Sequence, residues 1–384
     1  MAISNKMQYL VFILILFLPV ELAANVHAFY YIWYGSPPTD GKYIHWNHAV
    51  LPHWEERINR MYSNIGVKYN PPEEIHSIYY PFKGLYSSRD TEIIKIHQKE
   101  MYEAGIDTIV VSWWGKEDES HTVDSQGVNT DKILHNLLIE FEDNPYNITI
   151  ALHLEPYPGR TVQSIKSDIQ YIHRKYGHYK SLYRTPDTNL LLFYVYDSYH
   201  ILTQDWSRLL TTEGDLSIRN TANDGVFIGL WLHEYHGRDI KEGGFDGFYT
   251  YFSSHSFSFG STMSNWKYMC DYAIKNNLTS IISIGPGYND ERIRPWNAHN
   301  TKDRRKGEYY KQSWSNAINA NPKIVSITSW NEWGEGTQIE PAGNKQNKIY
   351  LNYDGNPYKY INITNEYAKK MKISLYSEAA IKEL

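Results

Sequence analysis

Residues 91–113, TEIIKIHQKEMYEAGIDTIVVSW, place a helical pattern directly before a buried strand. Apolar residues recur at helical spacing from 91 to 104, and Gly105 is a typical helix stop. The run 107–113 is almost continuously apolar, as in strands whose two faces are both covered. A helix that leads straight into such a strand is the unit from which parallel sheets are built.

The same alternation recurs along the chain. Seven further runs are predicted strands: 27–33, 148–154, 190–196, 226–231, 245–251, 280–285 and 324–330. Helical spacing at 131–142, 161–176 and 305–319 lies between them. Eight such units predict an α/β fold, a single (β/α)₈ TIM barrel with enlarged βα loops over residues 25–384. The short apolar patch 78–80 is assigned to the long first loop.

A doubly wound sheet is the alternative fold. Its first strand usually leads into a glycine-rich phosphate-binding turn. Here the first strand leads into Tyr34-Gly35-Ser36-Pro37-Pro38, which lacks that spacing. The barrel is therefore the favoured architecture.

Residues 1–24 form a separate N-terminal segment. Lys6 precedes an apolar run from Tyr9 to Leu18, and small residues close the segment. This pattern predicts a signal peptide or a short signal anchor. The apolar run is shorter than most segments that span a bilayer. N-glycosylation sequons begin at Asn147, Asn277 and Asn362. They support a secretory lumen, and we expect Asn147 to be unused because it opens a predicted strand.

Composition narrows the function classes. Lys and Arg number 38 against 43 Asp and Glu, so the net charge of −5 argues against a nucleic-acid partner. The single cysteine, Cys270, excludes an internal disulfide and a cysteine-built metal site. The 34 tyrosines and 12 tryptophans are amphipathic rings that suit a polar ligand with C–H faces, such as a sugar.

Acids and aromatic rings recur where the predicted strands end. In a parallel barrel, catalytic groups lie just past the carboxyl ends of the strands. The candidates there are Trp114, His153, Glu155, Tyr196, Tyr251, Tyr288, Trp330, Asn331, Glu332 and Glu335. Carboxylic acids that move protons beside rings that support sugar faces are typical of a glycosidase.

Glu332 and Glu335 are the strongest candidates for a pair of catalytic carboxyls. They lie three residues apart directly after the last strand, so a tight turn or a single helical turn can bring both carboxyls to the same side. In a shared, poorly solvated pocket, repulsion raises the proton affinity of one, giving one acid and one base. The alternative is two unrelated surface glutamates, and the adjacent Trp330 and Trp333 favour the paired interpretation.

Metal and phosphate sites are weaker hypotheses. The segments 153–155 and 233–236 contain ligand types, but neither has the His-Glu-x-x-His spacing of a zinc helix. We expect their histidines to hydrogen-bond sugar hydroxyls, and we expect no metal or cofactor. The basic cluster 302–306, KDRRK, is interpreted as a solvated face.

Several strings together resemble a known family. They are FYYIWYG (29–35), YYPFKGLYSSRD (79–90), GIDTIVVSWWG (105–115), HLEPYPGR (153–160), GFDGFYTYF (244–252), SIGPGYNDERIRPWN (283–297) and SITSWNEWGEGTQIEP (326–341). In this order they resemble the endo-α-1,2-mannosidases of glycoside hydrolase family 99. The resemblance spans about residues 28–345 and implies a metal-free barrel that retains anomeric configuration.

The resemblance also implies roles for individual residues. Glu332 would take the proton from the mannose 2-hydroxyl, which attacks from within the sugar to give a 1,2-anhydro intermediate. Glu335 would protonate the leaving oxygen and later deprotonate water. Glu155 would hydrogen-bond the reacting mannose. Ring positions of the glycone subsites match Trp114 and Tyr251, with Trp113 and Tyr249 as alternatives, and nearby loop positions match Arg294, Trp296 and Asn297.

The implied substrate is a glucosylated high-mannose N-glycan, cleaved internally to release a glucosyl-α-1,3-mannose disaccharide. The alternatives are another TIM-barrel glycosidase and a catalytically inactive, lectin-like barrel. By resemblance the protein would lie in the Golgi lumen, tethered through its N-terminus, and a secreted form is the other option because no stem precedes the first strand. We expect a monomer.

Overall fold

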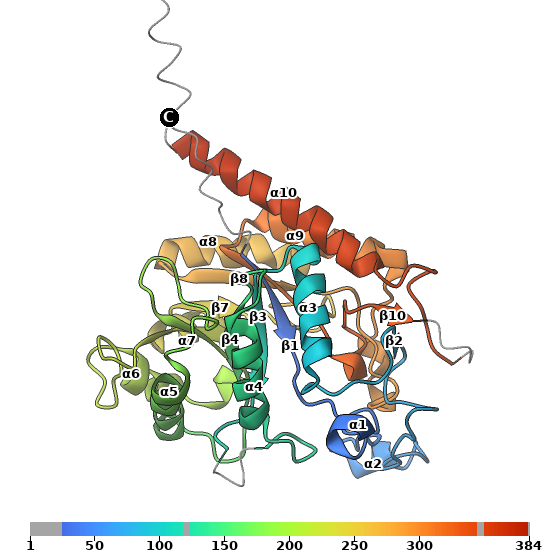
Figure 1. Cartoon of the computed structure of the whole chain (residues 1–384). Coiled ribbons are helices and arrows are strands. Elements are labelled where there is room, and N and C mark those ends of the chain that lie inside the picture. The colour runs from blue at the N-terminus through green and yellow to red at the C-terminus, as the bar shows by residue number, and fades with distance from the viewer. Residues whose placement is uncertain (1–24, 118–122, 344–348, 383–384) are drawn as a thin grey trace, which may run out of the picture.

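The computed structural model describes residues 25–117, 123–343 and 349–382. Eight parallel strands close into a barrel in the order β1-β3-β4-β5-β6-β7-β8-β9 (Figure 1). Their bounds are β1 Val26–Tyr30, β3 Thr108–Trp113, β4 Thr149–Leu154, β5 Leu191–Val195, β6 Gly225–Leu230, β7 Gly247–Tyr249, β8 Thr279–Ile284 and β9 Ile324–Ile327. The predicted (β/α)₈ barrel is confirmed.

Helices alternate with these strands and cover the barrel. They are α1 Pro37–Asp40, α2 Glu56–Asn59, α3 Thr91–Ala104, α4 Thr130–Glu142, α5 Val162–Tyr176, α6 Thr203–Leu210, α7 His236–Glu242, α8 Trp266–Asn276, α9 Glu308–Ala320 and α10 Lys359–Lys382. Asp90 caps α3 by accepting from the Glu92 amide at 3.0 Å. Gly105 ends α3 with a φ of 79°, in the left-handed region that favours glycine.

One loop assignment is confirmed, and one predicted strand ends early in the structure. The patch at 78–80 is confirmed as loop rather than barrel: β2, Tyr80–Pro81, pairs with β10, Ala342–Gly343, in a separate two-stranded sheet. The strand predicted over 324–330 ends early, at Ile327. The amide of Ser329 instead donates to the carbonyl of Thr337 at 3.0 Å, so the chain turns back on itself where the sequence still looks strand-like.

Aromatic rings fill the barrel interior. The ring of Phe29 lies 4.9 Å from His153, 5.7 Å from Tyr194, 5.8 Å from Tyr249 and 5.0 Å from Tyr251, measured between centroids. Barrel interiors are more often filled by branched aliphatic side chains. Part of the tyrosine excess therefore belongs to the core, where it forms a rigid floor beneath the carboxyl ends of the strands.

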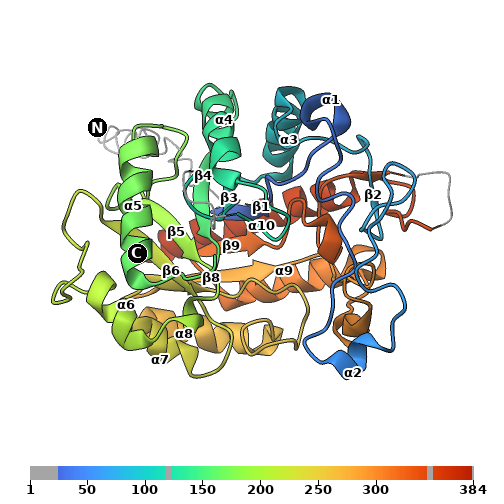
Figure 2. The same cartoon turned by 90° about the horizontal axis from the view of Figure 1, so that it is seen from below.

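The loops that follow the strands gather at one end. In Figure 1 the β1 arrow points down, towards α1 and α2 in the long loop between β1 and α3, and Figure 2 views the molecule from this end. Helix α10 packs along α3 and α9 and extends beyond the barrel (Figure 1). The predicted leader, residues 1–24, lies outside the described residues. Within the described ranges, no helix combines the length and apolarity needed to cross a bilayer.

The basic cluster 302–306 is not uniformly solvated, so that interpretation is wrong for Arg304. Its side chain is buried, and the guanidinium carbon lies 4.5–5.0 Å from the ring centroids of Tyr79, Tyr353 and Tyr360. Nη2 donates to the carbonyls of Gly336 and Gln338, at 2.8 and 2.7 Å. Arg304 thus ties the segment after Glu335 to the C-terminal part of the fold.

Candidate active site

Glu332 directly precedes a short 3₁₀ turn, Trp333–Glu335, that follows β9, and Glu335 is the last residue of that turn. The amide of Glu332 donates to the hydroxyl of Ser329 at 2.8 Å. The turn ends at Gly336, whose φ is 62°. A turn this tight carries both carboxyls to the same side of the backbone, as their spacing predicts.

Both carboxyls line one cavity of about 270 Å³ at the carboxyl end of the barrel. A third carboxyl, Glu155, lines it as well. The remaining walls are aromatic rings, histidines and loop residues: Tyr31, Trp33, His45, His48, Leu51, His76, Trp114, Ser125, Pro156, Tyr196, Tyr251, Ile293 and Arg294. Three acids surrounded by rings in a concave pocket match the arrangement by which glycosidases bind and cleave sugars.

Glu155 is fixed from below by the barrel interior. Its Oε1 accepts from the Ser112 hydroxyl at 2.8 Å and lies 3.0 Å from Nδ1 of His153. Nε2 of His153 in turn lies 2.8 Å from the Tyr249 hydroxyl. Because Glu155 is held by these partners, its other oxygen has a defined position in the cavity.

Burial sets the electrostatics of the acid pair. Glu332 is only 8% exposed. Burial, and then the charge of Glu335, raise the pKa of Glu332 well above its ordinary value. Burial also raises the pKa of Glu335, and the nearby Arg294 guanidinium opposes that shift. The pair therefore retains a proton to higher pH than free glutamates do, while the Arg294 guanidinium favours the ionised form of Glu335.

Arg294 connects Glu335 to a buried aspartate. Its Nη1 lies 3.2 Å from both Oε1 of Glu335 and Oδ2 of Asp290. Asp290 has no exposed surface and also accepts from the Tyr288 hydroxyl at 2.8 Å. The Glu335 carboxyl is therefore oriented by a charged partner that is itself held in place.

A second cavity of about 690 Å³ adjoins the first. The two cavities share Tyr196, Tyr251, Arg294 and Glu335, while Glu332 and Glu155 line only the smaller one. Aromatic side chains line part of the rest of the larger cavity, beside serine, asparagine and histidine residues: Trp54, Phe252, Phe257, Tyr288 and Trp296. Glu335 thus stands at the boundary between two ring-lined spaces.

The structure brings most of the predicted site residues to these walls. Trp114, Tyr196, Tyr251 and Tyr288 line one or both cavities, as do the loop residues Arg294, Trp296 and Asn297. The alternatives Trp113 and Tyr249 are buried and line neither.

Three predicted residues lie behind the walls instead. His153 supports Glu155 as described, and Trp330 and Asn331 have no exposed surface. The Asn331 side chain accepts from the Tyr31 amide at 2.7 Å and donates to the Tyr31 carbonyl at 2.8 Å. These side chains are bound to the protein itself rather than presented to a ligand.

The histidines expected at 233–236 do not reach the acids. His233 and His236 line a different cavity of about 280 Å³, beside α6 and α7. Among the described residues, no three His, Cys, Asp or Glu side chains form a group able to hold a metal ion.

Sequence reasoning missed the residues that the long first loop contributes. Trp33, His45, His48 and His76 line the smaller cavity, and Trp54 lines the larger one. Nε2 of His45 lies 2.7 Å from Oδ2 of Asp124, which joins this loop to the one after β3. The concentration of histidine and tryptophan at 45–54 was the available signal.

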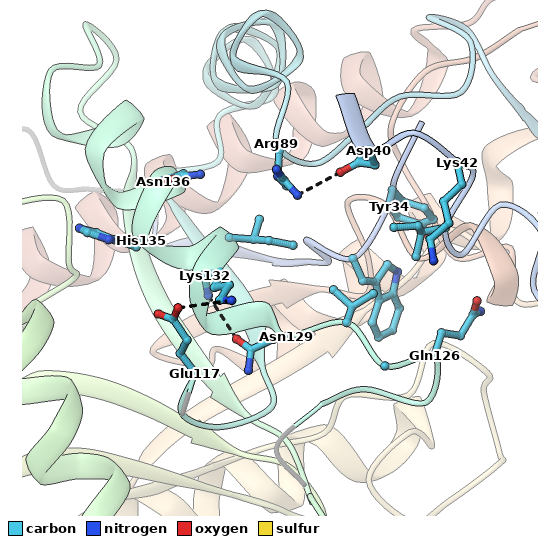
Figure 3. Close-up of a pocket in the computed structure, with 15 residues that line it drawn as sticks. Tyr34, Asp40, Lys42, Arg89, Glu117, Gln126, Asn129, Lys132, His135 and Asn136 are labelled. Atoms are coloured by element: carbon cyan, nitrogen blue, oxygen red, sulfur yellow. Dashed lines mark hydrogen bonds and ion pairs between the residues drawn. The ribbon is translucent and has the colours of Figure 1, made fainter. Parts of the chain in front are cut away.

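A further cavity of about 510 Å³ lies next to the smaller one and shares Trp33 with it. Figure 3 shows its polar lining, including the ion pairs of Arg89 with Asp40 and of Lys132 with Glu117. None of the three acids of the site lines this cavity.

Fold and site together define a glycoside hydrolase, and the comparisons with known proteins agree. The model of glycosyl hydrolase family 99 matches residues 21–373. The chain is 43% identical over 351 residues to mouse glycoprotein endo-alpha-1,2-mannosidase, covering 90% of this chain and 74% of the relative. It is also 43% identical over 356 residues to the human glycoprotein endo-alpha-1,2-mannosidase-like protein, covering 91% and 76%.

Solved structures point the same way. The GH99 endo-alpha-mannosidase from Bacteroides thetaiotaomicron superposes with a TM-score of 0.82 at 37% identity, covering 91% of this chain and 98% of that one. The chain belongs to glycosyl hydrolase family 99 and is a glycosidase, as the resemblance in the sequence predicts.

Proposed function

We propose that this enzyme cleaves internal α-1,2-mannosidic bonds of high-mannose N-glycans. The relatives named above as glycoprotein endo-alpha-1,2-mannosidases support this specificity. The observation that carries the proposal is the position of Glu335 between two cavities, with Glu332 and Glu155 in only one of them. An endo-acting enzyme needs space for sugars on both sides of the bond and an acid at the bond itself.

In the proposed reaction, the mannose being cleaved sits in the smaller cavity, beside Glu332 and Glu155. Glu332 removes the proton of its 2-hydroxyl, O2 bonds to C1, and the bond from C1 to the leaving oxygen breaks. Glu335 gives its proton to that oxygen. Water then adds to C1 as the C1–O2 bond opens, Glu335 takes the proton from the water, and Glu332 returns its proton to O2. Two displacements at C1 give net retention.

Glu335 must be protonated in the complex despite the charge of Arg294. In the free protein the Arg294 guanidinium lies 3.2 Å from Glu335 and stabilises its ionised form. The proposed roles require ionised Glu332 and protonated Glu335 in the complex. A sugar hydroxyl that donates to Glu332 stabilises its ionised form, and this is the role we give to the 2-hydroxyl.

The sugar that the enzyme releases from a glucosylated high-mannose glycan tests the proposed specificity. We expect a released glucosyl-mannose disaccharide, measured by mass spectrometry. A monosaccharide would instead mean exo-action. Glu335→Gln should lose roughly 10²–10⁴-fold in turnover of this glycan but regain much of it on a mannoside whose leaving group needs no protonation.

Glu332→Gln is the matched variant, and the mannoside with an activated leaving group should not restore its turnover. If that substrate restores turnover in Glu332→Gln but not in Glu335→Gln, the two roles are reversed. A 2-deoxy mannoside should bind without reacting; its turnover would contradict the anhydro route and favour another type of glycosidase. Binding without any cleavage by the unmodified protein would support the lectin-like alternative.

We further propose that the enzyme acts in the lumen of the secretory pathway. The sequon asparagines Asn147, Asn277 and Asn362 are all exposed. The relatives' names refer to glycoproteins, whose glycans are met in that compartment. Golgi residence, a membrane tether and a monomeric state stay predictions of the resemblance.

A further inference from the structure

Glu340 is a buried carboxylate outside both cavities of the site. It has no exposed surface and lies eight residues after Glu332, where its amide donates to the carbonyl of Trp330 at 2.9 Å. A carboxylate removed from water is costly unless donors surround it. Its partners therefore indicate what it does.

One oxygen of Glu340 serves both residues that flank Glu332. Its Oε2 accepts from the indole Nε1 of Trp333 at 3.0 Å and from the hydroxyl of Tyr86 at 2.7 Å. The oxygen of that Tyr86 hydroxyl accepts from Nδ2 of Asn331 at 3.3 Å. Glu340 thus holds Trp333 directly and holds Asn331 through the Tyr86 hydroxyl.

The other oxygen joins this group to the barrel wall. Oε1 of Glu340 lies 3.0 Å from Nε2 of His97 on α3. Nδ1 of His97 lies 2.9 Å from the hydroxyl of Tyr30 on β1. The carboxylate is therefore linked, through His97, to two elements outside the turn, α3 and β1.

We propose that Glu340 is a positioning residue that holds Asn331 and Trp333 and so fixes the direction of the Glu332 and Glu335 side chains. This inference rests on the proposed function only in that those two acids perform the chemistry. Trp333 lies between the two acids and begins the 3₁₀ turn that ends at Glu335, so a shift of its backbone would move both of them. A misplacement of about 1 Å at reacting groups can lower a rate about 100-fold.

The remaining contacts of the turn allow this role to be separated from folding. Asn331 is also bonded to the Tyr31 backbone, and the Trp333 amide donates to the Tyr34 hydroxyl at 3.2 Å. These bonds do not involve Glu340. In Glu340→Gln the side chain keeps its shape, but it loses its charge and only one of its two terminal atoms can still accept, so Trp333, Tyr86 and His97 are held less strongly.

The first test is kinetic, on the glucosylated glycan. We expect Glu340→Gln to lower kcat by about 100-fold with KM nearly unchanged. Trp333→Phe removes the Nε1–H, and the loss in the double variant should be smaller than the product of the two single losses, since both act through one hydrogen bond. A fully multiplicative loss, or wild-type kcat in Glu340→Gln, would overturn the proposal.

Asp131→Asn is the matched control. Asp131 is equally buried, and its Oδ1 accepts from Trp113 Nε1 at 2.8 Å and from the Tyr176 hydroxyl at 2.9 Å. Asp131 therefore accepts from the same kinds of donor as Glu340, an indole and a phenol, but does not contact the turn that carries the two acids. We expect its Tm to fall as in Glu340→Gln while kcat is retained. If Asp131→Asn and Glu340→Gln have the same Tm and lose the same amount of kcat, Glu340 only stabilises the fold and does not position the two acids.

A second measurement does not depend on activity. Hydrogen–deuterium exchange should accelerate in peptides covering 331–336 of Glu340→Gln, and not in those peptides of Asp131→Asn. Unchanged exchange there would overturn the positioning role even if the enzyme proved inactive on the glycan. Failure of wild-type cleavage with accelerated exchange would instead count against the proposed function alone.

Discussion

A single side chain, Glu332, combines a chemical use with a cost to folding. Its pKa is raised well above the ordinary value by burial and by the charge of Glu335. A carboxyl with a raised folded-state pKa favours folding in its protonated form. That contribution is complete below the unfolded pKa and is lost as pH rises through the folded pKa.

We expect Glu332→Gln to be more stable than the wild type, by about 2–4 °C in Tm near pH 8, because a neutral isostere removes the buried charge. The difference should shrink towards pH 4, where Glu332 is protonated. Thermal unfolding at several pH values measures it. A constant difference across pH would show that the ionisation of Glu332 carries no such cost.

The sequence predicted these residues with uneven success. Spacing after a strand was enough to predict that Glu332 and Glu335 share one cavity, because local turn geometry decides where both side chains point. It also placed Trp330 and Asn331 at the substrate, and here local spacing was insufficient. Their side chains are directed by partners far along the chain, such as the Tyr31 backbone for Asn331.

At the scale of the elements, the 3₁₀ turn Trp333–Glu335 packs closely against the long first loop. A Cβ added to Gly334 would lie 2.9 Å from Cδ2 and 3.1 Å from Nε2 of His76. His76 is itself buried and lines the smaller cavity. The absence of a side chain at 334 therefore lets the long first loop close against the turn.

Gly334→Ala should separate that loop from the turn and shift the acids. We expect about 1–3 kcal/mol of destabilisation from overpacking, and a loss of kcat of about 100-fold. Urea unfolding and steady-state kinetics measure the two effects. Gly159→Ala is the contrasting variant, because a Cβ there meets nothing within 4 Å and any destabilisation comes from its φ of 79°, whereas Gly334 has no positive φ and only its contacts oppose a Cβ.

Elements with strong local signals were predicted closely. Helix α3 was expected over 91–104 and has those bounds, since both its cap and its glycine stop are local. The end of β9 was placed three residues late, at 330 rather than 327. The return of the chain from Thr337 to Ser329 ends this strand, and no local residue pattern announces that pairing.

At the scale of the whole molecule, the division into two cavities comes from contacts across the chain. The amide of Leu51 donates to the Ile293 carbonyl at 2.7 Å, and Nε1 of Trp296 donates to the Leu51 carbonyl at 3.1 Å. These bonds seat the long first loop against the loop after β8. The barrel was predictable from strand and helix periodicity. The contacts between these two loops were not, because more than two hundred residues separate their partners in the sequence.

Trp54 offers a test of the larger cavity as the leaving-group side. Its side chain is 80% exposed and its ring lies 5.6 Å from that of Trp296. Removing a ring that stacks on a sugar costs about 0.5–1.5 kcal/mol, so Trp54→Ala should raise KM for the glycan by roughly 2–10-fold. Hydrolysis of a small activated mannoside without leaving-group sugars should be unchanged.

Tyr268→Ala removes an exposed ring on α8, away from both cavities, and serves as the control. Its KM for the glycan should equal that of the wild type. An equal rise in KM for both substrates of Trp54→Ala would show that Trp54 supports the site as a whole rather than the sugars beyond the bond.

The closure of the barrel has a consequence for how the protein is made. Strand β1 ends at Tyr30 and pairs with both β3 and β9, and β9 begins only at Ile324. A ribosome that adds about 5–20 residues per second needs roughly 15–60 s to synthesise the intervening chain. Throughout that time one edge of β1 lacks its neighbour, so the nascent chain must be shielded from self-association until its last barrel strand has emerged.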